Sequence, residues 1–210
     1  PLAIRNYCDF LLEQSAIFPP KYMLLLGKGY EPQFYRNSSS SNPDIVPVYG
    51  TPGSDNILTA GLKGSVLWDP AIATGRVTVV NNQQALDYLE KVREYESAGN
   101  AYWRKQVLHL SGGNDASQAG RILNSLNGNK TYVEDGQYAG KVTTFSRSNK
   151  ALVDPEVRKS TIDNINAGKN LITFIGHGSA SVFDLDVGQP LEYQNVGKYP
   201  VCYFNGCSTG

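Results

Sequence analysis

Two residues with complementary chemistry each follow a short apolar run near the end of the chain. One run covers 171–175 and leads into a Gly-His-Gly turn that holds His177, and the other covers 201–205 and leads through one glycine to Cys207. A thiol beside an imidazole is the smallest complete nucleophile–base pair, because the imidazole makes the attacking thiolate available at neutral pH. His177 and Cys207 are therefore the candidate catalytic residues.

Both apolar runs have the composition of buried strands in a parallel sheet, since they are short and rich in β-branched and aromatic residues. If both strands point the same way in one sheet, their carboxyl ends meet at one edge. Open α/β sheets bind their ligands at this edge. His177 and Cys207 would then lie together there.

Attack on a carbonyl group also requires donors for the oxyanion that forms. The glycines around His177 let the backbone turn sharply and leave its amides open to a ligand. We expect the backbone amides of Gly178 and Cys207 to be the two donors. Because Gly178 has no side chain, a substrate carbonyl can approach it closely.

The rest of the chain alternates between predicted strands and helices. Periodicity and turn residues predict strands at 22–26, 76–80, 107–110 and 141–145, and helices at 2–14, 82–96, 115–126 and 155–167. Such alternation predicts an α/β fold with a mostly parallel open sheet and helices on both faces. We expect the strands at 22–26 and 107–110 to share this sheet with the strands that precede His177 and Cys207.

Together these motifs resemble the gingipain family of cysteine peptidases, which is a caspase-like group. The resemblance rests on the apolar strand that ends in Gly-His-Gly-Ser and on the segment from Pro200 to Cys207, which matches the family pattern without gaps. It extends upstream to most of the chain, through the segments 22–27, 74–96 and 107–113. It implies a caspase-like fold, a single catalytic domain over 1–210 and a polypeptide substrate.

The resemblance also bears on the residues that support the pair. In the caspase-like group, the residue after the histidine and the cysteine itself supply the oxyanion amides, which agrees with Gly178 and Cys207. The gingipain pattern has an acidic residue just before a Gly-Gly pair, whereas this chain has Ser111 there. We therefore expect a dyad of His177 and Cys207 rather than a triad. Three roles stay open for Asp115: orienting the histidine, lining the specificity pocket, or capping a helix.

Three functions fit these residues. The first is a cysteine endopeptidase that works through an acyl-enzyme. The second is a sortase-like transpeptidase or signal peptidase of the type IX secretion system, which passes the same acyl group to an amine. The third is a catalytically silent binding module with the same fold. Serine at position 111 favours this third function, whereas the intact His177 and Cys207 count against it.

Composition narrows the possible partners. The chain has 210 residues, with 19 basic and 19 acidic side chains and a formal net charge of zero. Nucleic-acid-binding domains usually carry a basic excess, so we expect no nucleic-acid partner. No apolar run approaches the roughly 18 residues that a membrane span needs.

The three cysteines cannot all pair internally, and we expect Cys8 and Cys202 to be buried thiols. The oligomeric state is left open.

We expect no required cofactor, because the thiol–imidazole pair needs none for acyl transfer. The glycines at 27 and 29 lack the other residues of a phosphate-binding loop. Asp55 and Asn56 have the oxygens of a calcium loop but too few neighbouring carboxylates, which favours a solvated turn. The family resemblance alone allows a structural calcium ion in a loop.

The chain ends three residues after Cys207. We therefore expect it to be an incomplete segment of a longer protein. Residues beyond 210 would then form one wall of the S1 pocket, so this segment alone is expected to be poorly active. By resemblance only, the protein is expected outside the cell or on the bacterial cell surface.

Overall fold

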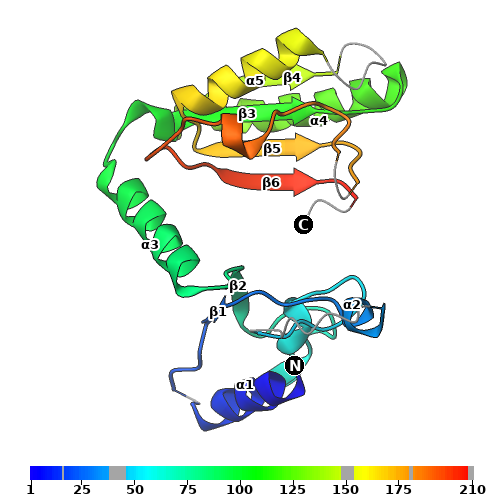
Figure 1. Cartoon of the computed structure of the whole chain (residues 1–210), viewed down its shortest axis with the longest axis vertical. Helices are drawn as coiled ribbons and strands as arrows, with labels where there is room; N and C mark the ends of the chain where they lie inside the picture. The colour runs from blue at the N-terminus through cyan, green and yellow to red at the C-terminus, as the bar shows by residue number, and fades with distance from the viewer. Residues whose placement is uncertain (16, 38–45, 148–153, 180–181, 208–210) are drawn as a thin grey trace. The chain divides into compact units, whose positions relative to one another are not determined.

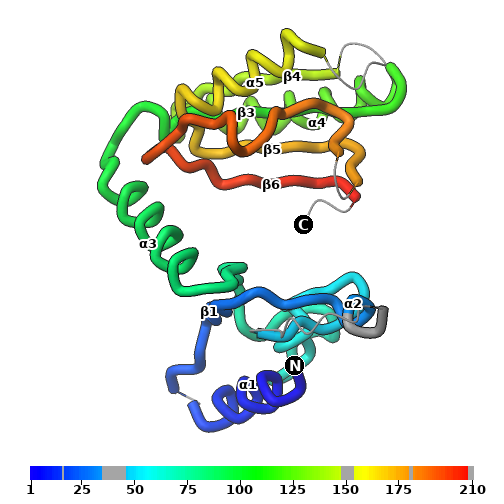
Figure 2. Tube along the Cα trace, viewed as in Figure 1, coloured from blue at the N-terminus to red at the C-terminus, as the bar shows by residue number. Residues whose placement is uncertain are grey.

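The computed structural model describes residues 1–15, 17–37, 46–147, 154–179 and 182–207. The chain divides into two compact units, which cover 1–90 and 91–210. Each unit combines parallel strands with helices, so the predicted α/β class is confirmed (Figures 1 and 2). No observation tests whether 1–210 acts as a single catalytic domain, which stays a prediction.

The first unit is built around two parallel strands that pair along their whole length. In chain order its elements are α1 (Leu2–Gln14), β1 (Tyr22–Leu26), α2 (Pro32–Asn37), the 3-10 helices η1 (Asn56–Leu58) and η2 (Leu62–Gly64), and β2 (Ala73–Val77). A small core of buried residues holds α1 in place, namely Cys8, Leu12, Leu62 and Ile72. The buried position of Cys8 confirms its prediction.

One expectation for the first unit is wrong. The strand 22–26 does not join the sheet that carries the candidate residues, because β1 pairs with β2 in a separate two-stranded sheet of the described chain. It is not buried on both faces either, since Tyr22, Leu24 and Leu26 are exposed. An apolar run predicts a strand, but it does not specify the strand's partner. The second strand of this pair also begins earlier than the predicted 76–80.

The second unit contains the strands that precede the candidate residues. Its four strands form one parallel sheet in the order β4-β3-β5-β6 (Figure 1). The strands are β3 (Gln106–Ser111), β4 (Lys141–Ser146), β5 (Leu171–Ile175) and β6 (Val201–Asn205). The helices are α3 (Asn82–Ser97), which spans the division between the units, η3 (Tyr102–Lys105), α4 (Ala116–Glu134), α5 (Pro155–Ala167) and η4 (Pro190–Glu192). The expected neighbours β3, β5 and β6 therefore share one sheet.

Helices cover both faces of this sheet, as predicted. On one face, Leu108 and Phe174 lie in a buried core with Ile165 of α5. Because successive strand residues point to opposite faces, His109 lies on the other face, where α4 packs on β3 and β4. His109 is 2% exposed, and its pKa is lowered by burial and by the charge of Lys130 on α4.

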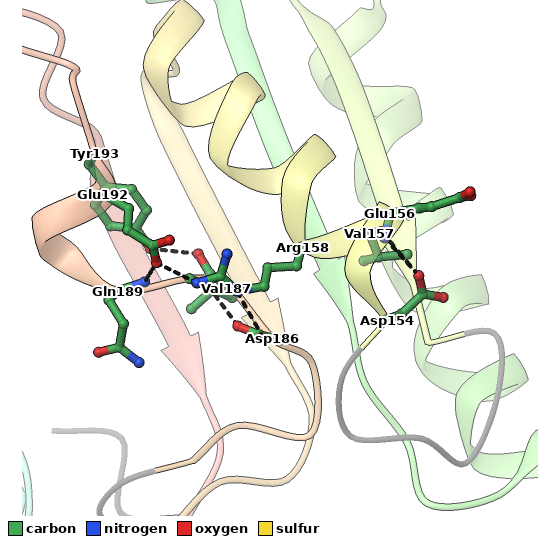
Figure 3. Close-up of polar contacts among 10 residues, drawn as sticks. Asp154, Glu156, Val157, Arg158, Asp186, Val187, Gln189, Glu192 and Tyr193 are labelled. Carbon is green, nitrogen blue, oxygen red and sulfur yellow. Dashed lines mark hydrogen bonds and ion pairs between the residues drawn. The ribbon is translucent and has the colours of Figure 1, made fainter.

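The helix boundaries follow local signals in one case and not in another. In α5, the Asp154 carboxylate accepts hydrogen bonds from the N–H groups of Glu156 and Val157 (Figure 3), proline occupies the first turn, and the bounds agree with the predicted 155–167. By contrast, the helix predicted over 115–126 continues through Gly128 to Glu134 as α4. A glycine inside a helix costs only about 1 kcal/mol relative to alanine, which packing on the sheet offsets.

Cys202 corrects a second expectation. It was predicted to be buried, but the residue as a whole is exposed. Its thiol is nevertheless partly shielded from solvent, and this burial raises the pKa of the thiol. β6 lies at the edge of the four-stranded sheet in the described chain, and Val201 and Tyr203 beside it are exposed as well. A continuous apolar run is typical of a central strand, but composition alone does not separate a central strand from an edge strand.

Candidate active site

His177 and Cys207 follow adjacent strands at one edge of the parallel sheet. β5 and β6 pair up to Ile175 opposite Asn205, and the N–H of Gly176 donates to the Asn205 carbonyl at 3.2 Å. Both candidate residues therefore lie two positions beyond the last strand pair, at the edge marked by the arrowheads of β5 and β6 (Figure 1). His177 is half-buried and Cys207 is exposed. The predicted strand pairing is confirmed, whereas the catalytic roles stay predictions.

The ring of His177 has a partner that the sequence analysis missed. Its Nε2 lies 3.0 Å from Oε1 of Gln118, a residue in the first turn of α4. The imidazole therefore faces the side of the sheet that α4 covers. Since residues 177 and 207 occupy equivalent positions after adjacent parallel strands, we expect the Cys207 thiol on this side too.

Gln118 is fixed by the start of α4. The N–H of Asn114 donates to Gln118 Oε1 at 2.8 Å, and the N–H of Gln118 donates to Asp115 Oδ1 at 2.8 Å. Both the side chain and the backbone of Gln118 are thus tied to the residues that lead into the helix. The sequence does hold a signal for this arrangement, because Asp-x-x-Gln has the spacing of a helix capping box.

Asp115 is the N-cap of α4. Of the three roles left open by the sequence, the structure shows the helix cap. The side chain is exposed, and its carboxylate accepts from the N–H of Gln118. Among the described residues, Asp115 is therefore linked to His177 through Gln118.

Ser111 ends β3 opposite Ile175. It is fully buried, and its hydroxyl has no hydrogen-bond partner among the described residues. Its backbone carbonyl accepts from the N–H of Arg147 at 2.9 Å. The position that the family pattern gives to an acid therefore holds a buried, neutral side chain here, and no described contact links its hydroxyl to the histidine.

Asp184 nevertheless places a buried carboxylate next to the turn that holds His177. Asp184 is 5% exposed, and its Oδ2 accepts from the N–H of Gly113 at 2.6 Å. Its own N–H donates to the carbonyl of His177 at 2.9 Å. Asp184 thus ties the turn after β3 to the turn after β5. The sequence offers no signal for it, because an acid in a polar connection is usually solvated.

The position of Asp184 also explains why residues 112 and 176 are glycines. A Cβ at Gly112 would lie 2.1 Å from Asp184 Oδ1, and a Cβ at Gly176 would lie 2.5 Å from the same oxygen. Any larger residue at either position would displace the carboxylate. This oxygen has no hydrogen-bond partner among the described residues, so close backbone packing rather than a second bond surrounds it.

Gly178, the expected oxyanion donor, lies in a short fold of chain next to the histidine. It forms an antiparallel bridge with Phe183, whose ring packs on Phe174 and Phe204 with centroid distances of 4.9 and 5.3 Å. The glycine is therefore held near the sheet edge by an aromatic cluster. The direction of the Gly178 and Cys207 amides toward a substrate stays a prediction.

The connection between His177 and β6 is anchored a second time, on α5. Arg158 contacts two acids of this connection, with its Nε 3.2 Å from Asp186 Oδ2 and a second nitrogen on Glu192 (Figure 3). The N–H of Gln189 also donates to Glu192 at 2.7 Å. Both contacts lower the pKa of Glu192, that of Arg158 most strongly. This connection is thus held near the histidine by Asp184 and on α5 by Asp186 and Glu192.

The residues do not support the calcium interpretation of Asp55. Its two carboxylate oxygens each accept from Arg76 of β2 at 2.7 Å, and Arg76 also donates to the carbonyls of Gly27 and Val46. The carboxylate thus belongs to a partly buried ion pair and not to a solvated turn. Within the described ranges, no three histidine, cysteine, aspartate or glutamate residues are grouped as metal ligands would be.

No helix in the described part of the chain is both long and apolar enough to cross a membrane.

The parallel sheet with helices on both faces matches the caspase-like fold of gingipains. The family comparison agrees: the model of peptidase family C25 matches residues 1–210, and the chain belongs to this family. The suspected gingipain relationship is therefore confirmed. No curated protein matches the chain.

Solved structures show the same fold. The chain is similar to the crystal structure of the Arg specific cysteine proteinase gingipain R, with 21% identity and a TM-score of 0.64, over 99% of this chain and 45% of that chain. It is also similar to the complex of Porphyromonas gingivalis RgpB pro- and mature domains, with 20% identity and a TM-score of 0.63, over 98% and 45% of the two chains. The chain thus spans less than half of the length of these relatives.

Proposed function

We propose that this chain carries the catalytic pair of a cysteine-type peptidase that cleaves polypeptides through an acyl-enzyme. One observation carries the proposal: in a member of peptidase family C25, the register of β5 and β6 brings His177 and Cys207 to equivalent positions at the carboxyl edge of the sheet. In this proposal Cys207 is the nucleophile and His177 is the base.

The reaction follows from this assignment. His177 takes the proton of the Cys207 thiol, and the thiolate sulfur forms a bond to the scissile carbonyl carbon. The amides of Gly178 and Cys207 stabilise the oxyanion. When the intermediate collapses, the C–N bond breaks and the imidazolium gives its proton to the leaving amine. Water then attacks the thioester, which releases the acid and restores the thiol.

The acyl-enzyme also defines the test for the sortase-like alternative. If an added amine replaces water in the second step, the product is a new amide rather than an acid. Adding a peptide amine to the assay and identifying the products by mass spectrometry separates transpeptidation from hydrolysis. The resemblance to gingipains supports a location outside the cell or on the bacterial surface, and we include this location in the proposal.

The proposal is tested most directly by the reactivity of the two exposed cysteines. Cys207 and Cys202 are both exposed on or just after β6, but only Cys207 follows the strand at the histidine edge. Alkylation with iodoacetamide near neutral pH should modify Cys207 much faster than Cys202. His177→Ala should slow Cys207 strongly, whereas Cys202, whose thiol pKa is raised by burial, should react at an unchanged slow rate. An unchanged rate for Cys207 in His177→Ala would contradict the proposal.

A further inference from the structure

We propose that Gln118 is a positioning residue that fixes the tautomer of His177, so that Nδ1 is the nitrogen that accepts the proton of Cys207. The inference rests on the proposed function for the role of Cys207. The tautomer itself can be measured without any activity. Gln118 lies in the first turn of α4, 59 positions from His177 in the sequence.

The first step is the identity of the atom that faces the imidazole. An amide side chain presents either its oxygen or its nitrogen, and the two have the same shape. Here the backbone N–H of Asn114 points at the same Gln118 atom at 2.8 Å. A backbone N–H can only donate, so this atom must be the acceptor oxygen. The hydrogen bond from Asn114 therefore excludes the flipped amide.

The second step is the proton on the ring. Nε2 of His177 lies 3.0 Å from this oxygen. Two acceptors at hydrogen-bond distance would repel each other, so Nε2 must carry a proton and donate it to Gln118. In a neutral imidazole, one nitrogen carries the proton and the other holds the free lone pair. Nδ1 is therefore the basic nitrogen of His177.

The third step is what this arrangement does in the reaction. When the lone pair on Nδ1 takes the proton from the Cys207 sulfur, the ring becomes an imidazolium and the thiol becomes a thiolate. The Nε2–H bond to Gln118 stays in place through this change, so the ring does not turn. Gln118 supplies orientation but no negative charge, because the amide is neutral. This suits a chain in which Ser111 replaces the acid of the family pattern.

The position of Gln118 is also well defined before any substrate binds. Its N–H is held by the N-cap Asp115, and its side-chain oxygen is held by Asn114. Both contacts belong to the start of a 19-residue helix that packs on β3 and β4. The acceptor therefore does not depend on the exposed cysteine turn.

The tautomer is best tested by long-range ¹H–¹⁵N correlation spectroscopy of the histidine rings in the unmodified chain, at a pH where the imidazoles are neutral. The chain has only two histidines, and His177→Ala identifies the signals of His177 by their loss. We expect Nε2 of His177 to show the shift of a protonated nitrogen and Nδ1 that of an unprotonated one. The opposite pattern would overturn the inference.

Two substitutions then test whether Gln118 is responsible. Gln118→Glu keeps an acceptor for both Nε2–H and the N–H of Asn114, so the tautomer should be retained. Gln118→Leu removes the acceptor, so the two tautomers should mix, and kcat for peptide cleavage should fall by about 10- to 100-fold with little change in KM. Comparable tautomer purity in Gln118→Leu would show that Gln118 does not set it.

A loosened helix start could also lower activity, so Asp115→Ala serves as the control. It removes the cap of α4 but leaves the Gln118 oxygen in the chain. We expect Asp115→Ala to lower the melting temperature at least as much as Gln118→Leu while lowering kcat less. If peptide cleavage does not depend on Cys207, the proposed function fails, but the tautomer result stands. If cleavage depends on Cys207 and the proton lies on Nδ1, only this inference fails.

Discussion

The turns that hold His177 and Cys207 lie at the same edge of the sheet but are supported in different ways. The histidine turn follows β5, which lies between β3 and β6. Its ring contacts Gln118, and its carbonyl accepts from the N–H of Asp184. The cysteine turn follows β6, the edge strand of the described sheet, and Cys207 is exposed.

The base and the nucleophile are therefore positioned by different parts of the molecule. The imidazole is oriented by contacts that come from other elements, namely α4 and the connection that follows the histidine. The thiol is placed by strand register, because its position follows from the pairing of β5 with β6. We therefore expect changes at the histidine turn to affect stability and activity together, and changes at Cys207 to affect activity alone.

The largest expected effect comes from Cys207→Ala. Loss of the nucleophile should lower kcat for peptide cleavage by at least about 10⁴-fold, while an exposed thiol contributes little packing, so the melting temperature should hardly change. Cys202→Ala is the matched control, because it removes a second thiol from the preceding strand, one that burial makes less acidic and that has no proposed role. Cleavage by Cys207→Ala at the parent rate would disprove the proposed nucleophile.

The second effect in size is expected for His177→Ala. Removal of a general base commonly costs about 10²–10⁴-fold in rate, so both peptide cleavage and alkylation of Cys207 near neutral pH should slow. Alkylation of Cys202 should not change and serves as the internal reference. If Cys207 reacted equally fast with and without His177, the two turns would not act as a pair.

The third effect tests the support of the histidine turn. Asp184→Ala leaves the buried N–H of Gly113 without its acceptor, which should lower the free energy of unfolding by about 1–3 kcal/mol. Cleavage should weaken as well, because the turns after β3 and β5 lose their link. Chemical denaturation and kcat measure the two effects.

Asp186→Ala is the matched control for this experiment. Asp186 lies two residues further on, and its loss removes a partly exposed ion pair with Arg158, for which about 0–1 kcal/mol is typical, and a partly buried hydrogen bond from the N–H of Gly188. Asp184→Asn keeps an acceptor for Gly113 and should recover part of the loss. Equal destabilisation by Asp184→Ala and Asp186→Ala would show that the buried carboxylate of Asp184 is no more important for stability than the partly exposed one of Asp186.

The sequence could predict the strands before the two candidate residues, but not all of their neighbours and contacts. The apolar runs before His177 and Cys207 predicted β5 and β6, because short runs rich in β-branched and aromatic residues favour strands. The partner of β1 and the edge position of Cys202 were not predictable, because strand pairing depends on contacts between distant segments. Gln118 was visible as part of a helix cap, but its contact with a ring 59 residues away was not.

The smallest effect is expected for Ser111→Ala. This substitution tests whether position 111, where the family pattern has an acid, supports His177 in this chain. Ser111 stands where the family pattern has an acid, but its buried hydroxyl has no partner among the described residues. Removing an unpaired buried hydroxyl loses no hydrogen bond, so the stability should stay the same or rise by up to about 1 kcal/mol. Peptide cleavage should stay within about twofold, because orientation of the ring comes from Gln118 and the turn is anchored by Asp184. A loss of activity as large as that of His177→Ala would show that Ser111 contributes directly to the reaction, and the dyad would then have to be replaced by a triad.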